Sequence, residues 1–269
     1  MIFTRDLQKS YGSRAVLRGL DLVAEPGAIT LVVGANAAGK STTLRLLAGL
    51  AEPDSGTIGI GGFDLRTQRR EALSQISFLP QAPRFHPRLT VGQVATFYAE
   101  LRGREAKRVP TALEAWGIAE FARTPTAKLS GGLRQRLALA VFALAEAPVL
   151  LLDEPGLSLD PEWRQRLQDF LTGEAKRGRT VVVATHLLGE WEGRADRCLL
   201  IEEGRCAGEL APERLRDGFF GGVGHVRAAA ERCERNVLPG ATVSEERIQR
   251  RGAAAEARAL SVGPVVVES

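Results

Sequence analysis

Cysteines are scarce in this sequence and form no recognisable pattern. The chain has three, Cys198, Cys206 and Cys233, among 269 residues. An odd number without zinc-ligand spacing excludes both a paired disulfide framework and a structural zinc site. We therefore expect reduced thiols, which are typical of a cytosolic protein.

Long apolar runs are also absent. The longest, residues 137–145, is too short to span a bilayer. The opening residues, MIFTRDLQKS, lack the apolar centre of a signal peptide. We therefore expect a cytoplasmic protein, and if it works at a membrane, another chain must cross that membrane.

The net charge is small for a chain of this length. There are 36 lysines and arginines against 32 acidic residues, a formal charge of +4, and the arginines are interleaved with glutamates. Bulk electrostatics therefore do not indicate a nucleic-acid partner. With 44% hydrophobic residues the chain can bury a core, and its length suits one large domain or one domain with an appendage.

Short, almost entirely apolar runs predict strands that are buried on both faces of a parallel sheet. Helical segments, including KSTTLRLLAGL and EWRQRLQDFLTGEAKRG, lie between them, which is the βαβ order of an open α/β sheet. Ligands of such sheets bind at the carboxyl ends of the strands, and every polar motif below follows an apolar run or opens a helix. The predicted strands are residues 30–34, 76–80, 149–153 and 181–185.

The rest of the chain divides into three further parts. Residues 82–147 contain no convincing strand and are predicted to form a helical insert. Residues 198–210 are predicted to form a hairpin that turns at Glu203 and Gly204 and closes the main domain, residues 1–215. Residues 216–269 are expected to be a small C-terminal appendage.

The stretch GANAAGKS, residues 34–41, fits the phosphate-loop pattern of a glycine, four residues and then Gly-Lys-Ser, between a strand and a helix. Its backbone N–H groups and the following helix N-terminus can bind phosphates. We expect Lys40 to lie between the β- and γ-phosphates, Ser41 to ligate Mg²⁺ and Thr42 to hold the α- and β-phosphates. Many such loops have glycine where this one has Ala37, and alanine tolerates fewer backbone angles. The predicted nucleotide contacts of the loop are Gly34, Asn36, Ala37, Ala38, Gly39, Lys40, Ser41 and Thr42.

A second motif, LSGGLRQRLALAVFALAEAPVLLLDEP, occupies residues 129–155. Ser130 is a natural cap for the helix that follows, and Gly131 and Gly132 leave backbone N–H groups free to bind an anion. A plain helix cap explains the serine but not two glycines, which cost about 1 kcal/mol each inside a helix.

These motifs resemble the Walker A, signature and Walker B motifs of ATP-binding cassette (ABC) ATPases, in that family's order and spacing, over about residues 1–215. The resemblance implies a P-loop NTPase core with a parallel-rich sheet, an N-terminal antiparallel β portion and a helical insert that carries the signature motif. It also implies ATP and Mg²⁺ as cofactors. Leu133 stands where the family usually has glutamine, so we expect a weaker polar contact there.

The resemblance also assigns roles to two carboxylates. Asp153 ends an apolar strand and holds Mg²⁺ through water, and Glu154 is the catalytic base for the water that attacks the γ-phosphate. Without the resemblance, Glu154 could be a surface turn residue.

Four more residues take roles from their match to family motifs. Gln81 contacts the metal and its water, and His186 contacts the γ-phosphate. Asp160 reaches the partner subunit, although in isolation it is only a helix cap before Pro161. Tyr11 stacks on adenine, although without the resemblance it could be an exposed turn aromatic.

The family's mechanism requires two cassettes, and this chain has one set of motifs. We expect it to pair head to tail with a second copy of itself or a homologous ATPase subunit, so that Ser130, Gly131 and Gly132 bind the partner's nucleotide. ATP would close the pair and hydrolysis would open it.

The segment APRFHPRLTVGQVATFYAELRG resembles ABC subunits that serve separately encoded exporters of drugs, polysaccharides, haem or copper-maturation factors. The expected partner is therefore a transmembrane permease, and the expected location is the inner face of the cell membrane. One alternative is a soluble ABC ATPase that acts on ribosomes or nucleic acid, but no second cassette, charged linker or heptad run is present. Another, a phosphate-loop kinase, leaves the signature helix unexplained.

Overall fold

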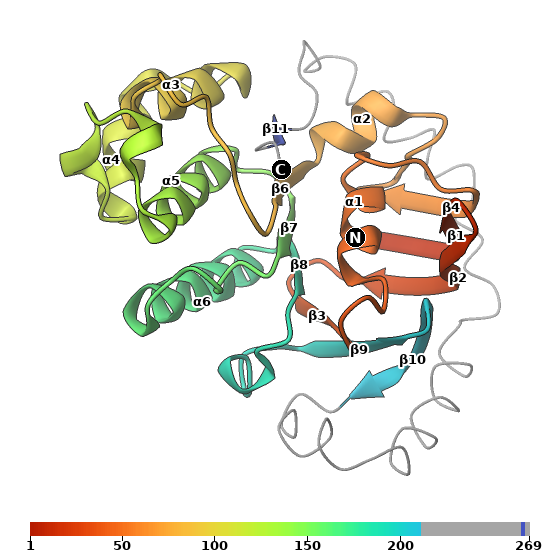
Figure 1. Ribbon diagram of the computed structural model, residues 1–269. Coiled ribbons are helices and arrows are strands. Elements are labelled where there is room, and N and C mark those ends of the chain that lie inside the picture. Colours follow the sequence, from red (N-terminus) through yellow and green to blue (C-terminus); the bar gives the residue numbers. More distant parts are fainter. Residues whose placement is uncertain (211–264, 267–269) are drawn as a thin grey trace.

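The computed structural model describes residues 1–210 and 265–266, and it contains two sheets flanked by helices (Figure 1). The first is an antiparallel sheet of four strands in the order β2-β1-β4-β5. Its strands are β1 (Ile2–Tyr11), β2 (Arg14–Ala24), β4 (Ser55–Ile60) and β5 (Phe63–Asp64). This sheet is the expected N-terminal antiparallel portion.

The second sheet has seven strands in the order β10-β9-β3-β8-β7-β6-β11, and only the β9–β10 pair is antiparallel. All residues of β3, β6, β7 and β8 are buried. The four predicted strands match the observed ones to within one residue at each end. The strands are β3 (Ile29–Val33), β6 (Ile76–Leu79), β7 (Val149–Asp153), β8 (Thr180–Ala184), β9 (Arg197–Glu202), β10 (Arg205–Leu210) and β11 (Val265–Val266).

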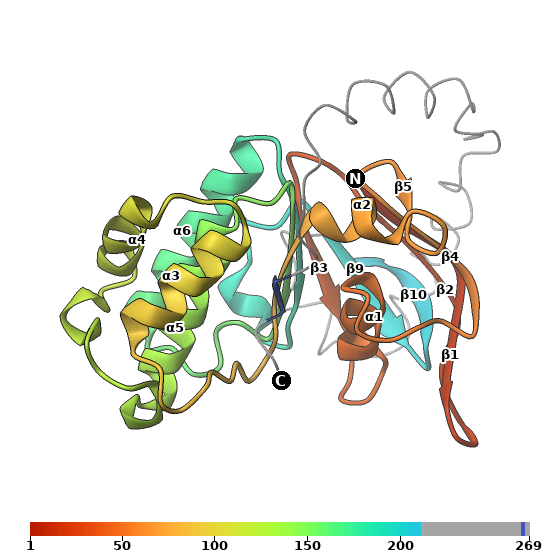
Figure 2. The same cartoon turned by 90° about the horizontal axis from the view of Figure 1, so that it is seen from above.

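The core consists of two apolar clusters, one on each face of this sheet. In β7, Leu150 and Leu152 belong to the first cluster, whereas Val149 and Leu151 belong to the second. Because successive side chains of a strand point to opposite faces, both faces need apolar residues, which explains the continuous apolar runs. Figure 2 shows α3 to α6 on one side and the antiparallel sheet with α1 and α2 on the other.

The helices largely follow the sequence pattern. Residues 82–147 contain helices and short 3₁₀ turns but no strand, as predicted. The segment KSTTLRLLAGL is helical only as far as Leu47, because the chain turns at Gly49, which has φ +70°. The α-helices are α1 (Lys40–Leu47), α2 (Arg69–Ser74), α3 (Val91–Leu101), α4 (Val109–Ala115), α5 (Gly131–Leu144) and α6 (Pro161–Lys176). The 3₁₀ turns are η1 (Ala106–Arg108), η2 (Ala119–Phe121), η3 (Thr126–Lys128) and η4 (Leu188–Glu190).

The predicted hairpin is formed by β9 and β10. Its turn residues, Glu203 and Gly204, have φ values of +48° and +77°, which suits a two-residue hairpin turn. A Cβ atom at Gly204 would lie 2.2 Å from the carbonyl oxygen of Val16, so only glycine fits there.

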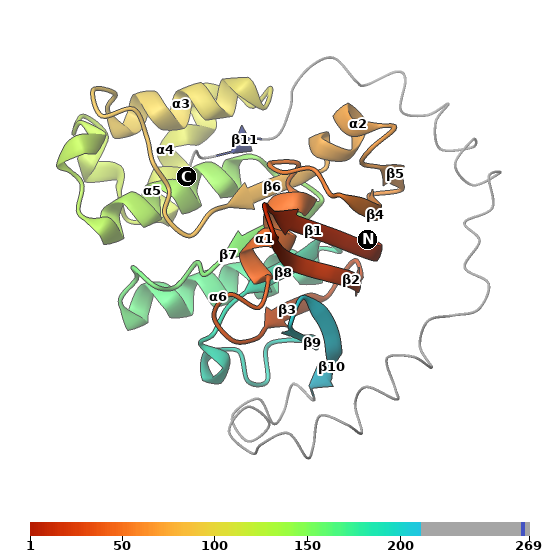
Figure 3. The same cartoon turned by 45° about the vertical axis from the view of Figure 1, so that its right-hand side comes forward.

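Most of the predicted appendage, residues 216–264 and 267–269, lies outside the described residues, as does Cys233. Val265 and Val266 pair in parallel with Ser77 and Phe78 of β6 and so extend the edge of the main sheet (Figure 3).

The cysteines and the helices of the described residues bear on two of the expectations from the sequence. Cys198 and Cys206 form no disulfide within the described residues, and burial raises the pKa of the Cys198 thiol to about 12. None of the helices in residues 1–210 is long and apolar enough to cross a membrane.

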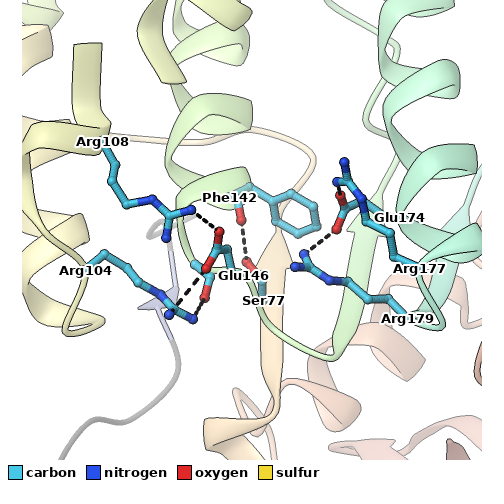
Figure 4. Close-up of polar contacts among 9 residues, drawn as sticks. Ser77, Arg104, Arg108, Phe142, Glu146, Glu174, Arg177 and Arg179 are labelled. Carbon is cyan, nitrogen blue, oxygen red and sulfur yellow. Dashed lines mark hydrogen bonds and ion pairs between the residues drawn. The ribbon is translucent and has the colours of Figure 1, made fainter. Parts of the chain in front are cut away.

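Two groups of ion pairs, one around Glu146 and one around Glu174, lie near the amino ends of β7 and β8 (Figure 4). Glu146, just before β7, pairs with Arg104 and Arg108. Glu174, near the end of α6, is buried and pairs with Arg177 and Arg179. Arginine side chains near helix C-termini can donate to the unpaired terminal carbonyls. Here the Arg104 Nη2 atom donates a hydrogen bond to the carbonyl oxygen of Ala145 at 3.1 Å. The amino ends of these strands are therefore lined by ion pairs, whereas the carboxyl ends of the strands carry the polar motifs.

Candidate functional site

The candidate site lies at the carboxyl ends of four adjacent strands. β3 leads into the phosphate loop, β7 into Glu154, β8 into His186 and β6 into Gln81. Since these strands are parallel and neighbours in the order β3-β8-β7-β6, their ends meet at one edge of the sheet. The topology therefore gathers residues that are up to about 150 positions apart in the sequence.

The backbone of the phosphate loop requires small residues at specific positions. Gly34 has φ +154°, and a Cβ atom there would lie 2.2 Å from the carbonyl oxygen of Ile201. Gly39 has φ +114°, and a Cβ atom there would lie 2.6 Å from a methyl group of Leu17. Ala37 has φ +65°, a left-handed conformation that is costly for a residue with a side chain. The loop therefore keeps its curved path even though alanine replaces glycine at this position.

Lys40 folds back across this loop. Its side chain is buried, and the Nζ atom donates hydrogen bonds to the carbonyl oxygens of Gly34 at 2.8 Å and Ala35 at 3.1 Å. The loop carbonyls thereby hold the ammonium group inside the curve of the loop, where its charge can attract an anion.

Ser41 and Asp153 form a pair of oxygen donors. The Ser41 Oγ atom donates to Asp153 Oδ1 at 3.1 Å, and Asp153 is only 3% exposed. Burial raises the pKa of the Asp153 carboxyl, and the charge of Glu154 adds to this effect, whereas the Ser41 hydrogen bond and the cations Arg45 and Lys40 oppose it. A hydroxyl and one carboxylate beside a phosphate loop fit Mg²⁺, which prefers oxygen ligands and binds through one or two carboxylates plus phosphates.

Glu154 and His186 contact each other directly. His186 Nδ1 lies 2.9 Å from Glu154 Oε1, and the backbone N–H of His186 donates to Oε2 at 3.3 Å. Glu154 is buried and has φ +47°, and its own N–H donates to the carbonyl of Ala184 at 2.8 Å. A non-glycine residue held at positive φ stores strain, which is frequent at functional sites. The buried carboxylate and the half-exposed imidazole can act together in proton transfer.

The signature segment forms the N-terminus of α5. Ser130 is its N-cap, and the Oγ atom accepts a hydrogen bond from the N–H of Leu133 at 3.2 Å. Leu133 packs against the first core cluster, which explains an apolar residue at this position. Ser130 and Gly131 are exposed. In residues 1–210 no hydrogen bond joins this segment to the phosphate loop.

Three other predicted residues are exposed. Gln81 lies two residues beyond the end of β6. Asp160 is the N-cap of α6 and accepts from the N–H of Trp163 at 3.1 Å. Tyr11, at the end of β1, is 49% exposed, with Lys9 Nζ 5.4 Å from its ring centroid. All three are accessible to a ligand or partner, but none is bonded to Lys40, Asp153 or Glu154 in the part of the chain described.

Gln135, which no sequence motif singles out, links two of the motifs. Gln135 is 2% exposed, and its Nε2 atom donates to the carbonyl oxygen of Pro155, the residue after Glu154, at 3.0 Å. A glutamine between two arginines at the start of α5 is the only signal in the sequence, and it does not indicate which carbonyl is bound.

Comparisons with known proteins show the family to which the chain belongs. A model of the ABC transporter family matches residues 17–156, and an AAA-domain model matches the shorter stretch 123–190. The Nod factor export ATP-binding protein I of Burkholderia orbicola is 35% identical over 221 residues, which are 81% of this chain and 73% of that protein. Its counterpart from Rhizobium etli is 33% identical over 222 residues, 80% of this chain and 70% of that protein.

Solved structures give the same result. A structure described as the ATP-binding subunit of an ABC transporter superposes with a TM-score of 0.75 at 26% identity, covering 85% of this chain and 98% of that one. A dimeric post-hydrolysis ATP-binding cassette with ADP and Pi bound has a TM-score of 0.73 at 23% identity, covering 79% of this chain and 99% of that one, and supports the fold alone. By family model, relatives and fold, the chain belongs to the ABC transporter family as an ATP-binding subunit.

Proposed function

We propose that this chain hydrolyses ATP to power export through a separate transmembrane permease. The observation that carries the proposal is the grouping of Lys40, the Ser41–Asp153 pair and the Glu154–His186 pair at one edge of the sheet. If these polar groups had a structural role only, the positive φ of Glu154 would have no explanation.

Each group has a distinct role in the proposed reaction. The loop N–H groups and Lys40 bind the phosphates. Ser41 and Asp153 hold Mg²⁺, which neutralises charge on the phosphate oxygens when bound, and Gln81 contributes from the end of β6. Glu154 orients the attacking water and accepts its proton, while His186 holds Glu154 in place and contacts the γ-phosphate.

The exposed residues serve the second subunit and the base of the nucleotide. Ser130, Gly131 and Gly132 present a helix N-terminus to the partner's γ-phosphate, and Asp160 contacts the partner. Tyr11 stacks on adenine. A cassette of the same fold is described as a dimer with ADP and Pi bound, which is the reason to propose a second subunit here. The second subunit is another copy of this chain or a homologous ATPase subunit.

Export and membrane location rest on the relatives, which are named Nod factor export ATP-binding proteins. We infer a permease partner and a position on the inner face of the cell membrane. For residues 216–269 we propose a role in dimer formation or regulation. If a chain without them dimerises, hydrolyses ATP and supports transport normally, that role is wrong.

Capture of the tagged chain from its own cells, followed by reconstitution, tests the function. We expect an integral membrane protein to co-purify and, when both are placed in lipid vesicles, to stimulate ATP hydrolysis. Lys40→Ala is the control and should abolish the stimulated activity. Recovery with ribosomes or nucleic acid, and no membrane protein, would favour the alternative of a soluble ABC ATPase.

A further inference from the structure

We propose that Arg164 is a positioning residue, which pairs with Glu190 to fix the loop after Glu154 against the loop after His186. The inference rests on the proposed function, because it concerns the geometry of the Glu154–His186 pair.

Arg164 reaches both loops from one place. It lies in the first turns of α6, and its Nε atom donates to the carbonyl oxygen of Leu159 at 3.0 Å. Its Nη1 atom forms an ion pair with Glu190 in η4. Leu159 belongs to the loop that follows Glu154, and Glu190 lies four residues after His186. One planar guanidinium group therefore connects the two loops, which suits its fixed, forked donors.

The packing around this ion pair leaves no room for a ligand. The Arg164 side chain lies over Gly156, where a Cβ atom would be 3.5 Å from both Cγ and Cδ of Arg164 and 3.7 Å from Glu190 Oε2. The cavity between the loops has a volume of only about 10 Å³, close to the minimum for one water molecule. The ion pair thus joins two segments that already pack together.

The loop after Glu154 and the loop after His186 are joined at two places, which constrains their relative position more than contact at one place would. The first is the contact between Glu154 and His186, at the start of both loops. The second is the Arg164–Glu190 pair, farther along both loops. Contacts at the start of the loops alone leave the later parts of both loops free to shift, whereas an added contact farther along fixes the relative orientation of the loops. Without the second, the imidazole can shift with respect to the carboxylate.

The chain offers a matched control pair. Arg194 Nη1 lies 2.8 Å from Asp169 Oδ1, and this pair also joins α6 to the segment that follows η4. Asp169 lies about one and a half turns farther along α6 than Arg164, and its side chain is 61% exposed. Among the described residues neither member of this pair is bonded to Glu154 or His186, so the pair reports the general effect of losing an ion pair between α6 and this segment.

The test is steady-state ATP hydrolysis by Arg164→Gln, Glu190→Gln and the double variant. We expect each single variant to lower kcat about tenfold, because small misplacements of catalytic groups are costly, with KM for ATP within about twofold of wild type because no phosphate contact changes. The double variant should be no slower than the slower single one, since both substitutions break one interaction. Arg194→Gln and Asp169→Asn should keep wild-type kcat, and melting temperatures identify any unfolded variant.

Several results would overturn the proposal: unchanged kcat, losses that multiply in the double variant, or equal losses in the control pair. If Arg164→Gln does not fold, Glu190→Gln decides alone. A wild-type protein without ATPase activity would instead refute the proposed function itself, whereas an active wild type with active Arg164 and Glu190 variants refutes only this inference.

Discussion

Replacing Glu154 with glutamine should stop turnover while leaving nucleotide binding intact. Glutamine has the size of glutamate, so the side-chain oxygen can still accept the hydrogen bond from the His186 backbone, and the amide nitrogen can face Nδ1. The substitution therefore removes basicity and charge without opening a cavity. The groups proposed to bind phosphate, Lys40 and Ser41, are unchanged.

The size of the effect follows from the role of the residue. General-base catalysis contributes roughly 10²- to 10⁴-fold, and at 1.36 kcal/mol for each factor of ten this raises the barrier by about 2.7–5.4 kcal/mol. We expect kcat to fall by this factor and ATP affinity to stay within a few-fold. The charge of Glu154 also helps to raise the pKa of Asp153, so its removal favours the ionised form of the Asp153 carboxyl.

Phosphate release under single-turnover conditions measures the chemical step, and light scattering with ATP and Mg²⁺ measures dimer formation. The variant should accumulate as an ATP-bound dimer, because binding is retained and hydrolysis is blocked. Glu71→Gln, an exposed glutamate in the first turn of α2, is the matched control and should behave as wild type. Turnover by Glu154→Gln within about tenfold of wild type would contradict the assignment of the base.

Three further predictions concern binding and stability. Lys40→Ala should weaken ATP binding roughly tenfold to a hundredfold, since hydrogen bonds to charged groups contribute about 1.5–3 kcal/mol, and unchanged affinity in titration calorimetry would exclude the loop from the site. Gly34→Ala should destabilise the protein by at least about 1–3 kcal/mol, measured by urea unfolding, because its Cβ would lie 2.2 Å from a backbone oxygen. Glu146→Gln should lower the melting temperature by about 2–4 °C at pH 7, because this side chain is 32% exposed and a screened pair is worth about 1 kcal/mol or less. The Arg108 hydrogen bond lowers the pKa of Glu146 below its usual 4.5, so its stabilisation is present above that pH and is lost as pH falls through the lowered value; a difference that persists at low pH would show another cause.

The sequence predicted the central strands because their signal is local. The run VLLLD matches β7 at both ends, since apolar residues on both faces and polar boundaries leave little choice of register. The phosphate loop and the signature cap were also predictable, because a strand, a loop and a helix N-terminus lie next to each other in the sequence. The end of α1 was not predictable from the apolar pattern, because the helix stops at Leu47, just before the turn at Gly49.

Contacts between distant segments could not be predicted in this way. Gln135 and Pro155 are joined by a buried hydrogen bond, and Arg164 and Glu190 by an ion pair, but neither pair has a distinctive spacing. The pairing of Val265–Val266 with β6 joins residues that are far apart in the sequence, and two valines carry too little periodicity to indicate a partner strand. Such contacts depend on the packing of whole elements, which local patterns do not encode.

The end of β7 shows how two adjacent carboxylates can serve different partners. Successive side chains of a strand point to opposite faces, so Asp153 turns toward Ser41 on α1. Glu154 follows directly, and an extended conformation would direct it to the other face. Its φ of +47° and its hydrogen bond to the Ala184 carbonyl instead bend the chain toward β8, where the carboxylate meets His186. The strain at Glu154 is therefore what allows one strand to supply both the proposed metal ligand and the proposed base. We expect a change that relaxed this backbone to move the Glu154 carboxylate away from His186 while leaving Asp153 beside Ser41.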